Sequence, residues 1–201
     1  MARDMSPVLK KCRSLGIEPQ YLGLDKKSNR AFSRAGKKVS EYGLQLKEKQ
    51  KAKFIYGVLE KPFRNMFAKA EKMRTGTAGE NLMSLLELRL DNVVFRLGFA
   101  RTRKEARQMV DHKYVLVNGK AVNIPSYTLS AGDVLTITEK AKRKADQRMK
   151  DVLEVTGGRA IPAWLEADHE NFTGTVKEIP TRDQIDVPVN EVLIVELYSK
   201  N

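Results

Sequence analysis

The chain has 201 residues and a formal net charge of +12, with 41% hydrophobic and 31% charged residues. This hydrophobic fraction is enough for a folded core and excludes a chain that is disordered throughout. No apolar run reaches the length of a membrane span, and the N-terminal segment lacks the apolar stretch of a secretory signal. We therefore expect a globular protein that is cytoplasmic or stays in the compartment where it is made. A single cysteine, Cys12, excludes an intrachain disulfide.

Residues 1–45 are rich in Gly, Ser, Lys and Arg, and we expect an irregular basic arm there. Helical patterning follows. Residues 47–60 predict a helix with a lysine-rich face that ends near Lys61 and Pro62. Residues 63–75 predict a second helix, whose apolar stripe is more consistent with packing than with a binding surface.

Residues 80–97 carry Leu and Val at helical spacing, which predicts one amphipathic helix with Gly98 at the position after its C-cap. The next helix is predicted to begin with a T-x-x-E capping box. In this box the Thr102 hydroxyl accepts from the Glu105 amide, and the Glu105 carboxylate reaches back to the Thr102 amide. Arg103 and Arg107 then share one helix face.

A tight β-hairpin is predicted directly after this helix. Residues 115–117 and 121–122 flank Asn118-Gly119, a pair that tolerates the positive φ angles of a type I′ turn. Short strands are expected at residues 123–124, 127–129 and 134–138. A basic run at residues 140–148 predicts a short exposed helix, and we interpret residues 157–159 as a turn between strands.

The C-terminal part is mixed. Residues 161–165 predict a turn of helix with Trp164 as a core anchor, and residues 173–179 predict a strand. Asn190 is expected to cap a terminal helix that runs through Tyr198. Because helices come first and short strands in hairpins follow, the order of elements indicates an α domain and then an α+β domain.

Charge is distributed unevenly. Residues 1–80 carry 19 Lys and Arg against 8 Asp and Glu, residues 81–150 carry 14 against 7, and residues 151–201 carry 4 against 10. A polyanion would therefore bind the first three quarters of the chain, and nucleic acid is the obvious candidate. An anionic membrane is the alternative. It would favour one long basic amphipathic helix, whereas these cations are spread over several elements, so we expect no membrane partner.

The sequence contains no recognisable catalytic constellation. His112 and His169 lie far apart without a matched nucleophile, Cys12 has no Cys-x-x-Cys partner, and no phosphate-cradling glycine loop is present. We expect a binding protein and not an enzyme, with no metal, no cofactor and no small-molecule substrate.

The residues from Arg89 to Val110, RLDNVVFRLGFARTRKEARQMV, continue into Val117-Asn-Gly-Lys120, residues 122–127 and residues 132–134. This pattern closely resembles the RNA-binding module of the bacterial-type small-subunit ribosomal protein S-four family. Trp164-Leu165, residues 194–200, the opening Met-Ala-Arg and the basic arm extend the resemblance over essentially the whole chain.

Two departures stand out. Many members carry four N-terminal cysteines that bind zinc, whereas this chain keeps only Cys12 and has Leu9 at the preceding ligand position. It therefore resembles the zinc-free variety. The family pattern after the basic helix is commonly His-Gly-His, whereas this chain has His112-Lys113-Tyr114. The missing glycine predicts a changed backbone at this corner.

The resemblance implies an α+β fold in three parts. A basic N-terminal arm (1–45) precedes a helical domain (46–88) that is joined by a C-terminal helix (188–201). Residues 89–187 then form the RNA-binding module of two helices and a small antiparallel sheet, with its extension.

The resemblance also implies a function. Such proteins are primary binders of small-subunit ribosomal RNA, at a multi-helix junction in its 5′ domain, and they nucleate assembly of the subunit body. They neighbour ribosomal protein S-five, at an interface that influences translational accuracy, and lie near the path by which messenger RNA enters. An RNA-modifying or aminoacylating enzyme with this module as an appendage is the rival, but only about fifty residues follow the module, too few for a catalytic domain. Repression of its own messenger is compatible with the first interpretation.

We expect recognition of RNA shape and phosphates, because A-form helices hide their base edges. Candidate contacts in the module are Arg89, Arg96, Arg101, Arg103, Lys104, Arg107, His112, Lys113, Asn118 and Lys120. Candidates in the arm and the helical domain are Arg3, Lys10, Lys11, Arg13, Arg30, Arg34, Lys37, Lys38, Lys47, Lys51 and Arg64. The alternative for each is an arginine or lysine that is merely solvated. We expect the acidic C-terminal part to face solvent or a basic neighbouring protein.

Overall fold

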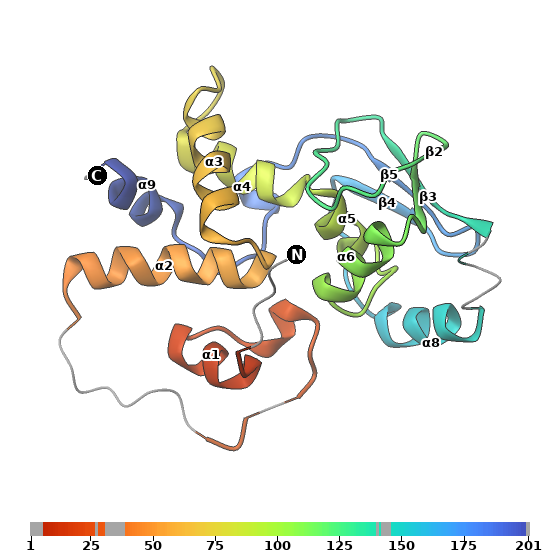
Figure 1. The fold of residues 1–201 in the computed structure, drawn as a ribbon, viewed down its shortest axis with the longest axis horizontal. Coiled ribbons are helices and arrows are strands. Elements are labelled where there is room, and N and C mark those ends of the chain that lie inside the picture. Colours follow the sequence, from red (N-terminus) through yellow and green to blue (C-terminus); the bar gives the residue numbers. More distant parts are fainter. Residues whose placement is uncertain (1–5, 27, 31–38, 140, 142–145, 200–201) are drawn as a thin grey trace. The chain divides into compact units, whose positions relative to one another are not determined.

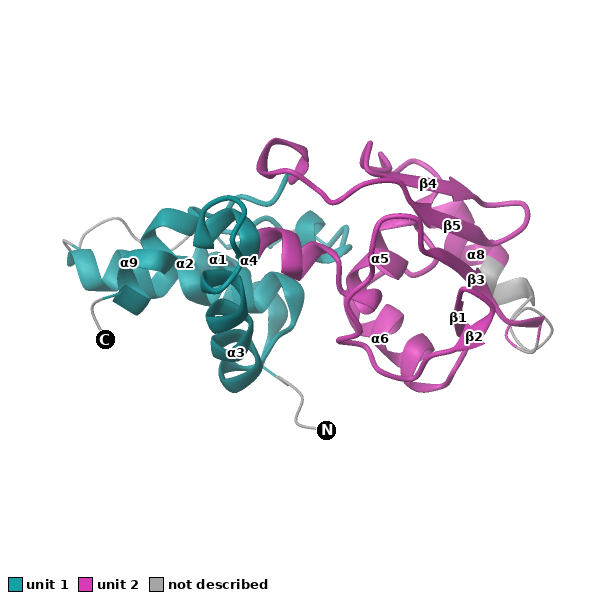
Figure 2. Cartoon of the chain, turned by 90° about the horizontal axis from the view of Figure 1, so that it is seen from above, with its two compact units in different colours: residues 1–82, 186–201 teal, residues 83–185 magenta. Residues whose placement is uncertain are grey.

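A computed structural model describes residues 6–26, 28–30, 39–139, 141 and 146–199, with residues 146–149 described by their backbone alone. Figure 1 shows the elements in chain order. The chain forms two compact units, one made of residues 1–82 and 186–201 and the other of residues 83–185 (Figure 2). Within the described residues, none of the helices combines the length and the apolar character needed to cross a membrane.

Unit 1 is helical. Its elements are α1 (Val8–Leu15), the 3-10 helix η1 (Pro19–Leu22), α2 (Glu41–Tyr56), α3 (Glu60–Glu71) and α9 (Glu191–Ser199). The helix α4 (Ala78–Glu87) begins in unit 1 and ends in unit 2.

The expectation of an irregular arm over residues 1–45 is wrong for much of the part that is described. Val8, Cys12 and Leu15 follow helical spacing and give α1 one apolar face, on which Cys12 and Leu15 are buried. Gly16, in the left-handed conformation with φ +70°, ends the helix. The high density of lysine and arginine in this segment conceals a short amphipathic pattern.

The predicted end of the next helix is also wrong. α2 ends at Tyr56, where Gly57 adopts φ +63° and its amide bonds to the Lys53 carbonyl. Pro62 lies instead in the first turn of α3, where a residue without an N–H breaks no helical hydrogen bond.

The C-terminal helix α9 packs against α2. Gln45 Nε2 donates to Glu196 Oε2 at 3.0 Å, and the Tyr198 ring stacks on Phe67 with 4.4 Å between centroids. The predicted cap is confirmed, since Asn190 Oδ1 accepts from the Val192 amide at 3.1 Å.

Unit 2 combines helices with a five-stranded sheet. Its helices are α5 (Leu90–Arg96), α6 (Arg103–Asp111), α8 (Asp146–Thr156) and the 3-10 helix η2 (Arg182–Gln184). Its strands are β1 (Val115–Val117), β2 (Lys120–Ala121), β3 (Val134–Ile137), β4 (Leu165–Asp168) and β5 (Thr173–Val176). The strand order is β2-β1-β3-β5-β4, and every pairing is antiparallel. The predicted α+β class with a small antiparallel sheet is confirmed.

The single helix predicted over residues 80–97 is broken into α4 and α5. Arg89 is extended, with φ −65° and ψ 136°, and forms an isolated bridge with Thr128. The Leu129 amide donates to the Leu88 carbonyl, and the Leu90 amide donates to the Tyr127 carbonyl. Backbone pairing with a distant segment therefore overrides a continuous helical pattern. Residues 127–129 were predicted to form a strand, and this bridge is their only strand-like feature.

The region after β3 departs further from expectation. Residues 157–159 were interpreted as a turn between strands, whereas they follow the helix α8 and precede β4. Residues 161–165 were expected to form a turn of helix, whereas Leu165 begins β4. Trp164 is 1% exposed, so its predicted place in the core is confirmed. Gly174 on β5 lies against Leu97, where any Cβ would clash with the leucine side chain.

Candidate nucleic-acid interface

The helix α6 is capped by half of the predicted box. The Thr102 hydroxyl accepts from the Glu105 amide at 3.2 Å, as predicted, whereas Glu105 Oε2 accepts from the Arg101 amide at 2.9 Å, one residue before the expected donor. A complete box, which was not predicted from the sequence, opens α4 through Thr77 and Glu80. Ala106 and Val110 are buried and form the core face of α6.

Arg101, just before α6, carries an unsatisfied donor. Its Nε is buried and makes no hydrogen bond within the described part of the chain. Its carbonyl accepts from Arg159 Nη2 at 2.7 Å, which fixes the backbone at this point. Lys104, in the first turn of the helix, is exposed. A donor without an acceptor beside the positive end of a helix dipole is suited to binding an anion.

The predicted hairpin forms as expected. Asn118 and Gly119 have φ +50° and +77°, and Val117 pairs with Lys120. Asn118 Nδ2 donates to Asp133 Oδ1 at 2.8 Å, and its Oδ1 accepts from the Val134 amide at 2.9 Å. Its side-chain amide therefore ties the turn to β3, while Lys120 is exposed.

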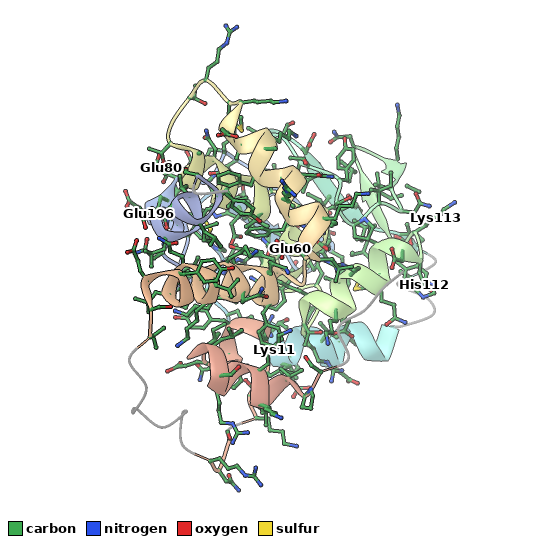
Figure 3. All side chains as sticks on the ribbon, turned by 60° about the vertical axis from the view of Figure 1, so that its left-hand side comes forward. Lys11, Glu60, Glu80, His112, Lys113 and Glu196 are labelled. Carbon is green, nitrogen blue, oxygen red and sulfur yellow. The ribbon has the colours of Figure 1, made fainter. Side chains whose placement is uncertain are left out.

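The corner between α6 and β1 is a Schellman motif. The Lys113 amide donates to the Val110 carbonyl at 2.8 Å, and the Tyr114 amide donates to the Met109 carbonyl at 3.0 Å. Lys113 adopts φ +58°, a conformation that glycine reaches without strain. His112 and Lys113 are exposed beyond the C-terminal end of the green helix α6 in Figure 3, and the His112 ring stacks on Tyr114 at 5.7 Å.

Two of the predicted arginines share one buried acid that was not predicted from the sequence. Asp91 is 1% exposed. Its Oδ1 accepts from Arg89 Nε at 3.0 Å, and its Oδ2 accepts from Arg89 Nη2 at 2.8 Å. Arg107 Nε and Nη2 reach the same Oδ2 at 2.9 and 2.6 Å.

A second buried acid, Glu87, organises Arg96 directly and Arg103 through Asn92. Glu87 accepts from Arg96 through both carboxylate oxygens, at 3.1 and 2.7 Å, and from Asn92 Nδ2 at 2.7 Å. Asn92 Oδ1 in turn accepts from Arg103 Nε at 2.7 Å. The Arg103 guanidinium lies 4.3 Å from the Phe95 ring centroid, in the geometry of a cation–π contact.

Internal partners therefore account for much of the predicted arginine surface. Arg89 and Arg103 are each 6% exposed, and the side chains of Arg96 and Arg107 are 12% and 23% exposed. Lys104, His112, Lys113, Asn118 and Lys120 are exposed. The acids Glu87 and Asp91 had one signal in the sequence: they fall within or beside a run of apolar residues, where an unpaired carboxylate is costly.

The predicted cations of unit 1 fall into two groups. Lys10, Arg30 and Arg64 are exposed. The half-buried ones are Lys11, Arg13, Lys47 and Lys51. The Lys11 ammonium lies 4.8 Å from the centroid of the Phe54 ring, and Lys51 pairs with Glu48 (Figure 3 labels Lys11 on α1). Arg3, Arg34, Lys37 and Lys38 lie outside the described residues.

Exposed cations that were not predicted occur at the end of α3 and after it: Lys69, Lys72 and Arg74. Arg159, which was expected only in a turn, lies 4.8 Å from the Phe95 ring centroid. Within the described ranges no group of three or more His, Cys, Asp or Glu residues is placed to hold a metal ion. Burial raises the pKa of the Cys12 thiol, so this cysteine is less prone to form a thiolate.

The segment that carries this geometry is an RNA-binding module of a known class, because residues 88–135 match the family model described as S4 domain. Residues 3–87 match the model described as ribosomal protein S4/S9 N-terminal domain.

Full-length relatives narrow the class to one family. The chain is 78% identical over 200 residues to small ribosomal subunit protein uS4 of Lachnoclostridium phytofermentans and 68% identical over 200 residues to that of Agathobacter rectalis, with 100% of each chain covered. It is 59% identical over 164 residues to the uS4 of Caldicellulosiruptor saccharolyticus, with 82% of this chain and 77% of the relative covered. The chain belongs to the family of small ribosomal subunit protein uS4.

Proposed function

We propose that this protein is a primary binder of small-subunit ribosomal RNA, that it grips a multi-helix junction in the 5′ domain, and that it nucleates assembly of the subunit body. Membership of the uS4 family makes it a structural ribosomal protein that binds ribosomal RNA, located in the small subunit of the cytoplasmic ribosome, and not an enzyme. The rival of an enzyme with an appended module is not favoured, since the whole chain matches whole relatives of the same length.

The observation that carries the proposed contact is the buried Nε of Arg101, which has no acceptor within the described part of the chain. A phosphate oxygen at the N-terminus of α6 would satisfy this donor and would also interact favourably with the helix dipole. Exposed Lys104 lies in the same turn of chain, so a phosphate there would meet more than one positive group.

The footprint then extends to the corner and the hairpin. Lys113 and Lys120 are exposed at the end of α6 and on β2, and the exposed ring of His112 adds a further donor. These groups contact backbone and 2′-hydroxyls and not base edges, because the deep groove of A-form RNA excludes side chains. Recognition thus depends on the shape of the folded RNA.

We assign a protein partner to the acidic part of the chain. Glu166, Glu170 and Glu178 are exposed in a region whose formal charge is negative. These negative charges repel RNA phosphates, whereas a basic neighbouring protein would complement them. Ribosomal protein S-five is the neighbour that we propose, with an effect on translational accuracy, and the path of entering messenger RNA is nearby.

Salt dependence of RNA binding tests the proposed contact. Replacing both Lys104 and Lys120 by Gln should weaken binding of the 5′ domain of small-subunit ribosomal RNA and flatten the slope of log affinity against log salt by about 0.7–0.9 for each lost phosphate contact. Filter binding at several salt concentrations measures both quantities.

Lys177→Gln is the matched control, because this exposed lysine lies in the acidic part beside Glu166, at 3.3 Å. Its slope should equal that of the wild type. An unchanged slope in the Lys104 and Lys120 double variant would show that these side chains do not contact phosphate. Failure of the wild-type protein to co-sediment with small subunits in high salt would contradict the function itself.

A further inference from the structure

We propose that Asp91 is a positioning residue for RNA recognition: it holds the Arg107 guanidinium in the one orientation in which Arg107 meets a phosphate. This inference rests on the proposed function, since it requires that α6 faces RNA. It assigns a role in binding an anion to a buried residue that itself carries negative charge.

The carboxylate is rigidly placed. The Asp91 amide donates to the Pro125 carbonyl at 3.2 Å, and the neighbouring Leu90 amide donates to the Tyr127 carbonyl at 2.9 Å. Arg89 then clamps both carboxylate oxygens, at 3.0 and 2.8 Å. With the backbone and the side chain both fixed, Asp91 offers Arg107 an acceptor that does not move.

Arg107 approaches this acceptor from a second helix. It contacts Oδ2 through Nε and Nη2, so the plane of its guanidinium is fixed by two hydrogen bonds. Arg89, with 7% of its side chain exposed, is enclosed, whereas 23% of the Arg107 side chain is exposed. Arg107 is therefore held by an internal partner while part of its side chain still reaches solvent.

The formal charge of the trio also favours this role. Two arginines on one aspartate carry a formal charge of +1, so the trio as a whole attracts an anion.

Stability alone does not account for this buried trio, because apolar residues of similar volume often stabilise a fold as well or better. An arginine that is already ordered loses less rotamer entropy when it binds, which raises affinity without any new contact.

Simple electrostatics and positioning predict opposite changes in RNA affinity for Asp91→Asn. Removal of a negative charge beside a phosphate site should tighten RNA binding. Loss of positioning should instead weaken it, by about 3–10-fold, the cost of ordering one long side chain. Asp111→Asn is the matched control, because Asp111 lies on α6 one turn from Arg107, and this variant should tighten RNA binding or leave it unchanged.

The experiment measures affinity for the 5′ domain of small-subunit ribosomal RNA with the full chain, after circular dichroism has shown that each variant is folded. Weaker binding by Asp91→Asn, together with recovery in Asp91→Glu, supports the proposal. Binding by Asp91→Asn as tight as or tighter than the wild type overturns it. Wild-type protein that does not bind this RNA instead contradicts the proposed function.

A second variant covers the outcome in which Asp91→Asn fails to fold. Arg107→Lys keeps the charge but cannot be held in a plane by two hydrogen bonds. We expect it to bind RNA several-fold more weakly with an unchanged salt slope, and unchanged affinity overturns the proposal. Where Asp91→Asn folds, Arg107→Lys should cost little in its background, because the positioning is already lost.

Discussion

At the scale of the residue, Lys113 occupies a backbone position that suits glycine. Its φ of +58° completes the Schellman motif that ends α6 and turns the chain into β1. A left-handed conformation costs an L-residue about 1–2 kcal/mol. The chain accepts this cost and gains an exposed positive charge at the corner.

Lys113→Gly should therefore raise the free energy of unfolding by about 0.5–1 kcal/mol, because relief of the strained φ exceeds the extra entropy of glycine in the unfolded chain. Urea denaturation measures the change. Lys113→Ala, which removes the charge but keeps a Cβ, should stay close to the wild type. A glycine variant no more stable than the alanine variant would mean that this position is unstrained.

Residue-level prediction from the sequence succeeded where the signal was local. Asn118-Gly119 requires nothing beyond its own φ angles, and the turn formed as expected. Arg103 and Arg107 show where it fails, since a sequence does not tell whether a guanidinium meets solvent or a buried partner brought from another segment. The partners Asp91 and Asn92 lie on α5, and only the packing of α5 on α6 brings them to Arg103 and Arg107.

At the scale of the element, long-range pairing decided the outcomes that periodicity missed. The stripe over residues 80–97 is continuous, yet backbone hydrogen bonds from residues 127 and 129 break it at Arg89. The strand β4 has only four residues, and it was missed because it becomes a strand only by pairing with β5. The isolated signals of α6 and of the hairpin were sufficient by themselves.

The packing of helix α9 within unit 1 can be tested through the pH dependence of stability, because α9 carries Tyr198. Burial, together with the Glu60 carboxylate that accepts from the Tyr198 hydroxyl at 3.4 Å, raises the pKa of Tyr198 to about 12. An unfolded tyrosine titrates near pH 10. The stabilisation of the neutral form is fully present below about pH 10 and is lost as the pH rises toward 12, because the unfolded chain releases this proton first.

Tyr198→Phe should therefore remove part of the fall in unfolding free energy between about pH 10 and 12. Urea titrations across this window, followed by tyrosinate absorbance, measure it. Tyr42→Phe is the control, since Tyr42 is 61% exposed and lacks the burial that acts on Tyr198. Identical pH profiles for Tyr198→Phe and the wild type would exclude this source of stability.

At the scale of the whole molecule, the charge pattern separates a basic part that we expect to bind RNA from an acidic part that we expect to bind a protein. Ultraviolet crosslinking in the assembled subunit should place RNA contacts within residues 1–150 and none within residues 151–185, because the latter region carries a formal negative charge. RNA crosslinks concentrated in residues 151–185, with the α6 corner unprotected, would contradict this division. The class of the protein could be inferred from charge and motif, whereas the joining of the C-terminal helix to the helical domain was expected from the family resemblance alone, since charge and periodicity do not show which distant segments meet.

The return of residues 186–201 to unit 1 sets an order of events during synthesis. Gln45 meets Glu196 across a separation of 151 residues, so the partner of α2 is made after the whole of unit 2. Unit 2 is one continuous segment, residues 83–185, so all of its residues are made before residue 186. As the chain emerges from the ribosome that makes it, the RNA-binding module is therefore complete while unit 1, although begun first, still waits for α9. A nascent protein of this design presents its α6 surface to RNA before its own fold has closed.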